Sequence, residues 1–179
     1  MALIDVRDLK IQFFTFRGTA KAVDGVSFRI EKNQTLGLIG ESGCGKTTTA
    51  MAMMQLVKPP GRVVGGSIFF NGSDIVNMTD EQIRQLRGKD ISIVRQEAQN
   101  ALNPVMTIGR QITELILEHE SVTKKAALAR AQNQLNLVGI SDKRINSYPH
   151  EFSGGMKQRA MVAIATACNP KLLILDEPT

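Results

Sequence analysis

One short glycine-rich segment constrains the fold of this chain more than any other part of its sequence. Residues 40–47 read G-E-S-G-C-G-K-T, which fits the pattern G-x-x-x-x-G-K-[S/T]. The apolar residues 35–39 before it predict a strand. Residues 45–57, rich in Ala, Met and Leu, predict a helix that Pro-Pro-Gly at 59–61 would stop. A strand, a glycine turn and a helix in this order predict an α/β fold.

The chemistry of this segment suits phosphate binding. Glycines let backbone N–H groups turn inward, and the following helix adds the positive end of its dipole. Lys46 would contact β- and γ-phosphates, and the Thr47 hydroxyl would ligate Mg²⁺. A merely flexible glycine turn is the alternative, and the flanking strand and helix disfavour it. The predicted nucleotide-binding residues here are Gly40, Glu41, Ser42, Gly43, Cys44, Gly45, Lys46, Thr47 and Thr48.

A second candidate feature is an apolar run, residues 172–175, followed by two carboxylates, Asp176 and Glu177. The run predicts a buried parallel strand, and α/β sheets bind ligands at the C-terminal ends of such strands. Asp176 could hold Mg²⁺ through water, while Glu177 could orient or deprotonate the water that attacks the γ-phosphate. Taken alone, a strand exit with solvated acids is the commoner interpretation. The phosphate loop reverses that preference.

A third candidate feature is the stretch 153–159, S-G-G-M-K-Q-R. Ser153 can cap a helix whose first turn carries Gly154 and Gly155, which leaves bare N–H groups and a small hydroxyl for phosphate oxygens. An ordinary helix N-cap is the plainer alternative for this stretch.

The remaining pattern indicates where other elements lie. Alternating apolar residues predict strands through Leu9, Ile11 and Phe13 and at 23–30. Strands are also expected at 67–70, closed by an Asn-Gly turn, and at 91–94, with a helical block from 106 to 138. A chain of 179 residues can bury one core with a small appended subdomain.

Charge, cysteine content and the length of apolar segments limit which partners and which cellular environment can be expected. The net charge of +5 comes from scattered Lys and Arg, which favours a solvated basic surface, and no nucleic-acid partner is expected. Cys44 and Cys168 match neither a disulfide framework nor zinc-ligand spacing. No segment has the length of an apolar membrane span or a signal peptide, so any membrane contact should be peripheral.

Together, residues 40–47, Gln96, 153–159 and 172–177 resemble the ATP-binding-cassette (ABC) family in order and separation, over essentially the whole chain. The resemblance implies an α/β P-loop NTPase (RecA-like) core with an N-terminal antiparallel β subdomain and an inserted helical subdomain, incomplete at the C-terminus. Two further segments are similar to those of the ATPase subunits of dipeptide, oligopeptide and nickel importers. They read L-N-P-V-M-T-I-G at 102–109 and Y-P-H-E-F-S-G-G at 148–155.

The resemblance also implies a division of the chain and a mechanism. Residues 1–96 would form the β subdomain and Walker A core, 97–160 the helical subdomain with the signature motif, and 161–179 the Walker B region. Two cassettes, identical or related, would pair head to tail and trap two molecules of ATP. The Walker A loop of each would face the signature residues of the other.

Particular roles follow from the same resemblance. Gln96 would touch Mg²⁺ and the attacking water, near the groove that receives the permease's coupling helix. Phe13 would stack on adenine, with Phe14 and Phe16 as rivals. The implied cofactors are ATP and Mg²⁺. The implied catalytic residues are Lys46, Gln96 and Glu177, the metal ligands Thr47, Gln96 and Asp176, and the further ATP contacts Ser153, Gly154 and Gly155.

The resemblance has two departures. Residues 97–101 read E-A-Q-N-A where peptide importers more often carry an acid, Pro and a Thr-Ser pair, which weakens the assignment of coupling and cargo. The family's D-loop and switch histidine would follow residue 179. His119 and His150 precede the acidic strand, and surface or loop roles are expected for both. We therefore expect a C-terminally truncated sequence that is unstable and hydrolyses little ATP alone.

The predicted function is ATPase activity that energises solute uptake, with peptides, nickel and sugar-like solutes all open as cargo. Expected partners are a second cassette, permease subunits and, indirectly, an extracytoplasmic solute-binding protein, at the cytoplasmic face of the membrane. A non-transport cassette for DNA repair or chromosome organisation is the alternative, but it would usually carry a coiled-coil or zinc-bearing insertion. A ribosome-acting cassette would carry two copies, and a plain P-loop kinase or GTPase would lack the Ser-Gly-Gly element.

Cys44 carries a separate hypothesis. Its thiol lies beside Lys46 and a helix N-terminus, both of which favour the thiolate. An unreactive side chain that faces the core is the alternative.

Overall fold

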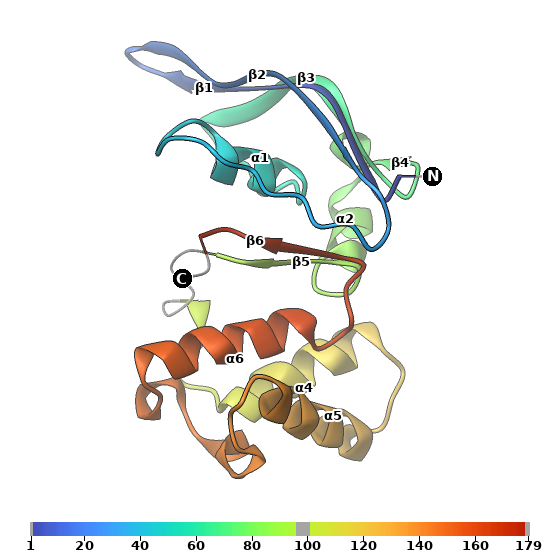
Figure 1. Ribbon diagram of the computed structural model, residues 1–179, viewed down its shortest axis with the longest axis vertical. Coiled ribbons are helices and arrows are strands. Elements are labelled where there is room, and N and C mark those ends of the chain that lie inside the picture. The colour runs from blue at the N-terminus through green and yellow to red at the C-terminus, as the bar shows by residue number, and fades with distance from the viewer. Residues whose placement is uncertain (1, 96–100, 178–179) are drawn as a thin grey trace. The chain divides into compact units, whose positions relative to one another are not determined.

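The computed structural model describes residues 2–95 and 101–177 (Figure 1). The chain divides into two compact units, Met1–Arg84 and Gln85–Thr179. Each unit has its own core and is described by itself. The first contains β1 (Ile4–Thr15), β2 (Gly18–Ile30), α1 (Lys46–Ala52), β3 (Gly61–Phe70), β4 (Ser73–Asp74), the 3₁₀ turn η1 (Ile75–Asn77) and the start of α2 (Asp80–Leu86).

The first unit is built on an antiparallel sheet with the strand order β2-β1-β3-β4. The strands predicted through Leu9 and at 23–30 and 67–70 are confirmed as parts of longer strands. The Asn-Gly turn at 71–72 is confirmed between β3 and β4, where both residues have the positive φ that such a turn needs.

A β-bulge sets which side chains of β1 face the core. Ile4 and Val6 are buried, and the next buried residues are Leu9 and Ile11, so the alternation shifts by one position between Val6 and Leu9. The pairing register shifts at the same place, where Asp8 has φ 45°. An extra residue in one strand reverses the faces of all that follow. The bulge therefore places Leu9, Ile11 and position 13 on the same face as Ile4 and Val6.

Helix α1 is shorter than the predicted helix at 45–57. It ends at Ala52, and the chain turns back at Gln55, which has φ 48°. The Gln55 N–H donates to Ala52 O at 3.0 Å and the Leu56 N–H donates to Met51 O at 2.8 Å. These two bonds and the left-handed residue form a Schellman motif, which satisfies the last carbonyls of the helix. The Pro-Pro-Gly segment therefore does not stop the helix.

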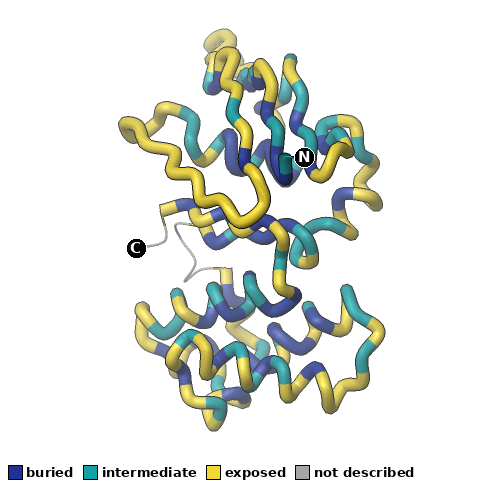
Figure 2. The backbone as a smooth tube through the Cα atoms, turned by 45° about the vertical axis from the view of Figure 1, so that its right-hand side comes forward, coloured by how far each residue is buried: buried dark blue, intermediate teal, exposed yellow. Residues whose placement is uncertain are grey.

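The strand predicted at 35–39 is wrong. These residues have no strand pairing in the structure, and the stretch between β2 and α1 is exposed almost throughout (Figure 2). Leu38 is 44% exposed and Ile39 is 98% exposed. A strand exists only where its N–H and C=O groups pair with a neighbour, and in this unit β1, β2, β3 and β4 pair with one another instead.

The second unit contains β5 (Ile91–Val94), α4 (Ile108–His119), α5 (Lys124–Leu137), the 3₁₀ turns η2 (Asp142–Asn146) and η3 (Pro149–Glu151), α6 (Gly154–Thr166) and β6 (Leu172–Leu175). The predicted helical block at 106–138 is thus two helices. Thr107 and Thr123 cap them through side-chain oxygens that accept from the N–H groups of Arg110 and Ala126.

Three helices share the core of this unit. Their fully buried residues recur at helical spacing of three or four, which puts one apolar stripe of each helix against the others. These residues are Ile108, Ile112 and Ile116 on α4, Ala127, Ala131 and Leu135 on α5, and Ala160, Ala163 and Ala167 at α6 and its end. Among the described residues, no helix is long and apolar enough to cross a bilayer.

Strands β5 and β6 pair in parallel, with Ile91 opposite Leu172 and Val94 opposite Leu175. The strands predicted at 91–94 and 172–175 are confirmed at those bounds. The prediction that the second strand is buried throughout is wrong, because Leu173 is 37% exposed and Leu175 is 51% exposed. Helix α6 packs against β5, and alternation along β6 indicates that one face of the strand is covered.

Candidate functional site

The glycine-rich segment leads directly into α1. Gly43 has φ 82° and Gly45 has φ 97°, a left-handed conformation that glycine adopts without strain. Residues 40–44 are exposed. Gly45 is the N-cap of α1 and provides no side-chain hydrogen bond to the helix. The loop therefore presents backbone at its surface, at the start of a helix.

The end of the loop lies against strand β2. A Cβ on Gly45 would be 2.5 Å from Ala22 O and 3.2 Å from Val23 Cγ2, so no other residue fits here without moving backbone. Sequence reasoning missed Ala22, because an alanine in a strand gives no signal of a contact with a loop 23 positions away. Gly45 thus allows the loop to approach the antiparallel sheet closely.

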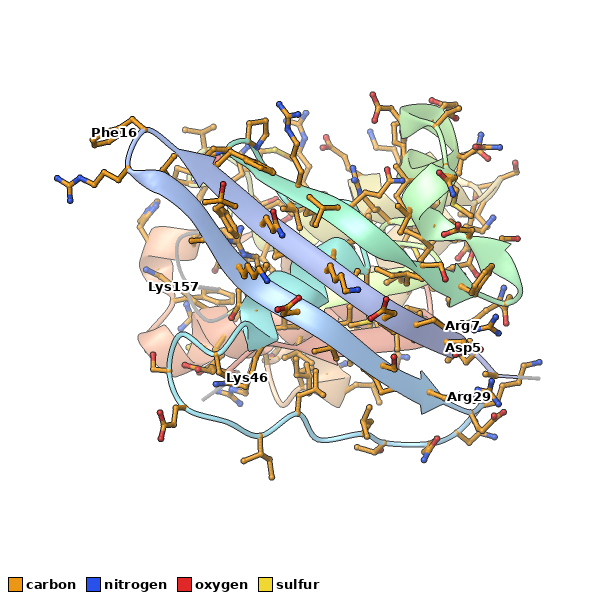
Figure 3. All side chains as sticks on the ribbon, turned by 90° about the horizontal axis from the view of Figure 1, so that it is seen from above. Asp5, Arg7, Phe16, Arg29, Lys46 and Lys157 are labelled. Atoms are coloured by element: carbon orange, nitrogen blue, oxygen red, sulfur yellow. The ribbon has the colours of Figure 1, made fainter. Side chains whose placement is uncertain are left out.

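Lys46 folds back over the loop that precedes it. Its Nζ donates to Gly40 O and to Glu41 O, each at 2.8 Å, and lies 3.7 Å from Cys44 Sγ (Figure 3). The ammonium group thus lies at the centre of the loop, on the chain's own carbonyl oxygens. That position is suited to exchange these oxygens for those of a phosphate.

The other side chains of the segment vary in exposure. Cys44 is exposed, so the alternative in which it faces the core is wrong. Thr47 is exposed and Thr48 is half-buried, both in the first turn of α1. Thr49 is buried, and its hydroxyl donates to Gly45 O at 2.9 Å.

Three phenylalanines near the β1–β2 turn lie in different environments. Phe13 is half-buried and pairs with Ala20 on β2 and Gly61 on β3. Phe14 points to the opposite face, and Arg62 lies 5.8 Å from the centre of its ring. Phe16 is 93% exposed at the tip of the hairpin (Figure 3). Of the three, Phe13 lies on the core-facing side of the sheet.

In the second unit, the two acids follow β6 directly. Asp176 is 8% exposed, and its N–H donates to Val94 O at 2.9 Å, which extends the pairing with β5 by one residue. Glu177 is exposed and has φ 48°. The left-handed backbone at Glu177 turns the chain at the end of the strand, so the two carboxylates leave the sheet at its C-terminal edge.

One ion pair joins β6 to β5, and a second joins the helices that precede the strand. Lys171 Nζ lies 2.6 Å from Asp90 Oδ1, which joins the start of β6 to the start of β5. Arg130 on α5 contacts the carboxylate of Glu120 and donates to Ala167 O at 2.7 Å, which joins α5 to the end of α4 and the end of α6. The Arg130 guanidinium lowers the pKa of Glu120 by hydrogen bonding. These contacts fix the chain that enters β6.

The Ser-Gly-Gly element begins α6. Ser153 Oγ accepts a hydrogen bond from the Met156 N–H at 3.4 Å, so the ordinary N-cap is present. Ser153, Gly154 and Gly155 are all exposed, and a Cβ on Gly155 would meet nothing within 4 Å. The helix start is therefore open to a ligand or partner as well as capped.

The predicted site residues are divided between the units. Phe13 and residues 40–48 belong to the first, while Ser153, Gly154, Gly155, Asp176 and Glu177 belong to the second. Gln96 lies outside the described residues. His119 is half-buried near Gly88, and His150 is exposed and stacks on Tyr148.

Comparison with known proteins relates this arrangement to one family. The ABC transporter family model matches residues 23–179. The oligopeptide transport ATP-binding protein OppD of Bacillus subtilis (strain 168) is 48% identical over 180 residues, which are 99% of this chain and 50% of that protein. The dipeptide transport ATP-binding protein DppD of Escherichia coli (strain K12) is 41% identical over 181 residues, 100% of this chain and 55% of that protein.

A solved structure gives the same fold. The dimeric structure of the ATP-binding cassette MJ0796 in a post-hydrolysis state, bound to ADP and Pi, has a TM-score of 0.88 at 21% sequence identity. It covers 98% of this chain, which spans 74% of that chain. The chain spans about half the length of the peptide-transport relatives above. The predicted P-loop fold is confirmed, and this chain belongs to the ABC transporter family.

Proposed function

We propose that this chain is the ATP-binding and hydrolysing part of an importer that takes up dipeptides or oligopeptides. The observation that carries the proposal is the glycine loop, in which Lys46 Nζ lies on two backbone carbonyls and Gly43 and Gly45 are left-handed, directly before α1. This arrangement suits the binding of a triphosphate. The names of the relatives, which are peptide-transport ATP-binding proteins, support the cargo.

Nucleotide binding would use the predicted loop residues, from Gly40 to Thr48, with Lys46 as the cation. The sheet register supports Phe13 as the residue that contacts adenine. Phe13 pairs with Ala20, and Ala22, two residues along β2, contacts the loop at Gly45. A strand rises about 3.3 Å per residue, so the ring is a few residue lengths from the phosphate loop. Of the two rivals, Phe14 points to the other face of the sheet and Phe16 projects from the tip of the hairpin.

The donor set fits Mg²⁺ held together with a nucleotide. No group of three metal-ligating side chains occurs among the described residues. Mg²⁺ in nucleotide sites needs only one or two protein oxygens, because phosphates and water supply the rest. The Thr47 hydroxyl and the Gln96 side-chain oxygen would be such ligands, and the Asp176 carboxylate would hold the ion through water. The ion would neutralise charge on the phosphates.

In hydrolysis Glu177 would orient or deprotonate the attacking water and Gln96 would contact that water, while Lys46 would stabilise the charge that develops on the γ-phosphate. Asp176 and Glu177 leave the end of β6 next to each other, one buried and one exposed. We assign the buried Asp176 to the metal and the exposed Glu177 to the attacking water. The roles are assigned by motif position.

A second cassette, identical or related, would complete the site. Its Ser153, Gly154 and Gly155 would bind the nucleotide held by the loop of the first. The exposure of all three residues at the start of α6 supports a role at a surface that meets a partner.

Permease subunits would dock on the helical part of the second unit, at the cytoplasmic face of the membrane. A surface cavity of about 420 Å³ lies there, lined among others by Ala101, Met106, Gln111, Met161 and Ile164. Ala101 in its lining is five positions after Gln96 in the sequence, the residue expected to link nucleotide state to the permease. A solute-binding protein would contribute indirectly. The division at 1–96, 97–160 and 161–179 remains our proposed domain description.

The test is transport by the protein reconstituted in vesicles with its permeases. We expect ATP-dependent uptake of labelled peptides and its loss in the Lys46→Ala variant, with Lys32→Ala, an exposed lysine in the turn after β2, as a control for removal of a lysine. Uptake of nickel or a sugar in place of peptide would contradict the proposal that the cargo is peptide. ATP hydrolysis that no permease alters would favour the non-transport alternative.

A further inference from the structure

We propose that Gly61 and Val57 are positioning residues that hold the ring of Phe13 for contact with adenine. This inference rests on the proposed nucleotide binding. Neither residue carries a functional group that could act on ATP, and sequence patterns mark Gly61 only as the end of a Pro-Pro-Gly segment. Their role follows from contacts in the first unit.

The ring of Phe13 lies directly over Gly61. The two residues are partners across β1 and β3, and Gly61 is buried. A Cβ at position 61 would lie 2.7 Å from Phe13 Cε1, 3.0 Å from Phe13 Cζ and 2.9 Å from Val57 Cγ1. These distances are shorter than van der Waals contact. The ring therefore occupies the space that any side chain at position 61 would need.

The backbone around Gly61 is held too firmly to move away. The Phe14 N–H donates to Pro60 O at 3.0 Å, and the Gly61 N–H donates to Lys58 O at 2.9 Å. The first bond anchors β1 to the start of β3, and the second closes the turn that leads from Val57 into the strand. A side chain at position 61 would thus displace the ring of Phe13 more easily than the backbone.

The same segment continues from the helix of the phosphate loop. Val57 follows the Schellman turn at Gln55, where the Leu56 N–H returns to Met51 O on α1. One short stretch of chain thus joins the helix that begins at Lys46 to Val57 and Gly61, the residues that lie against the ring of Phe13. The ring position is set relative to the loop that is proposed to hold the phosphates, which is the requirement for binding both ends of one nucleotide.

The experiment compares ATP with inorganic tripolyphosphate, which has the phosphates but no base, by calorimetric titration of the purified protein. We expect Phe13→Ala and Gly61→Ala each to weaken ATP binding about fivefold or more, because stacking on a base is lost. The affinity for tripolyphosphate should change less than about twofold, the usual size of the effect that a substitution has on an independent site. Gly65→Ala is the matched control, because a Cβ there would meet only the flexible Lys10 side chain at 3.4 Å.

A double variant tests whether Gly61 acts through the ring. If it does, adding Gly61→Ala to Phe13→Ala causes no further loss of ATP affinity. Val57→Ala is a second test, because it removes part of the side chain that supports the Phe13 ring without overpacking the site. It should also weaken ATP binding and leave tripolyphosphate binding unchanged. It replaces Gly61→Ala in the comparison if that variant fails to fold.

The outcomes separate the inference from the proposed function. Equal weakening of ATP and tripolyphosphate by Gly61→Ala would overturn the positioning role and indicate a general disturbance. An unchanged ATP affinity in Phe13→Ala would overturn it while the phosphate loop stands. Failure of the unmodified protein to bind either compound would overturn nucleotide binding itself.

Discussion

Replacement of Gly45 by alanine tests how the loop is held against the sheet. Two free-energy costs are expected for this change. An alanine with φ 97° lies in left-handed space, at a cost of about 1–2 kcal/mol. Its Cβ would also lie 2.5 Å from Ala22 O, a backbone atom of β2 between the paired residues Lys21 and Val23. Overpacking of this kind costs about 1–3 kcal/mol more.

Gly43→Ala isolates the first cost. Gly43 has φ 82°, but a Cβ there would meet nothing within 4 Å. We therefore expect Gly43→Ala to lower the free energy of unfolding by about 1–2 kcal/mol, and Gly45→Ala by about 2–5 kcal/mol. For a chain of this size, each kcal/mol corresponds to a fall of about 2–4 °C in Tm.

Urea and thermal unfolding of the two variants, side by side with the unmodified protein, measure this difference. Tripolyphosphate titration should show weaker binding in Gly45→Ala than in Gly43→Ala, because only the former pushes the loop away from β2. If both variants are equally stable, the contact between the loop and Ala22 does not constrain the protein and our reasoning is refuted.

Three further predictions concern other groups. Glu177→Gln should lower ATP hydrolysis about 10²–10⁴-fold, the contribution of a general base, and leave ATP affinity unchanged; retained turnover would remove Glu177 from the mechanism. Alkylation of Cys44 should slow in proportion to bound ATP·Mg²⁺, while Cys168 stays unmodified because it is buried and burial raises its pKa; equal rates with and without nucleotide would contradict the placement of the thiol. Arg130→Ala should lower stability by about 1–3 kcal/mol at pH 7, because it leaves Glu120 and a helix-end carbonyl without their partner. Since Arg130 lowers the pKa of Glu120, the ion-pair part of this contribution is present above the unfolded pKa of a glutamate and is lost as the pH falls through the lower folded value. The difference in stability between variant and parent should therefore narrow in acid to the part from the bond to Ala167 O; a difference that does not change with pH would argue against the ion pair.

Features that depend on neighbours in sequence could be predicted well. The bounds of β5 and β6, the cap at Ser153 and the helical spacing of Ile108, Ile112 and Ile116 are all visible in the sequence. The conformation of a helix or its cap is set by bonds among residues three or four positions apart, so a local pattern contains the needed information. The phosphate-loop motif belongs to this class.

Features that depend on a distant partner could not be predicted. The apolar run at 35–39 has strand character, yet it pairs with no strand, and α1 ends early because Gln55 completes a Schellman motif. The alternation of Leu9, Ile11 and Phe13 is visible in the sequence, but the bulge at Asp8 that puts them on the same face as Ile4 and Val6 is not.

The sequence by itself therefore determined the family, the motif residues and the type of most elements, because these are local. Only the tertiary structure decided that the phosphate loop lies against Ala22, that Lys46 folds back onto Gly40 and Glu41, and that Gly61 leaves space for the ring of Phe13. Such contacts join positions far apart in the chain. Their geometry exists only once the strands have paired and the helices have packed.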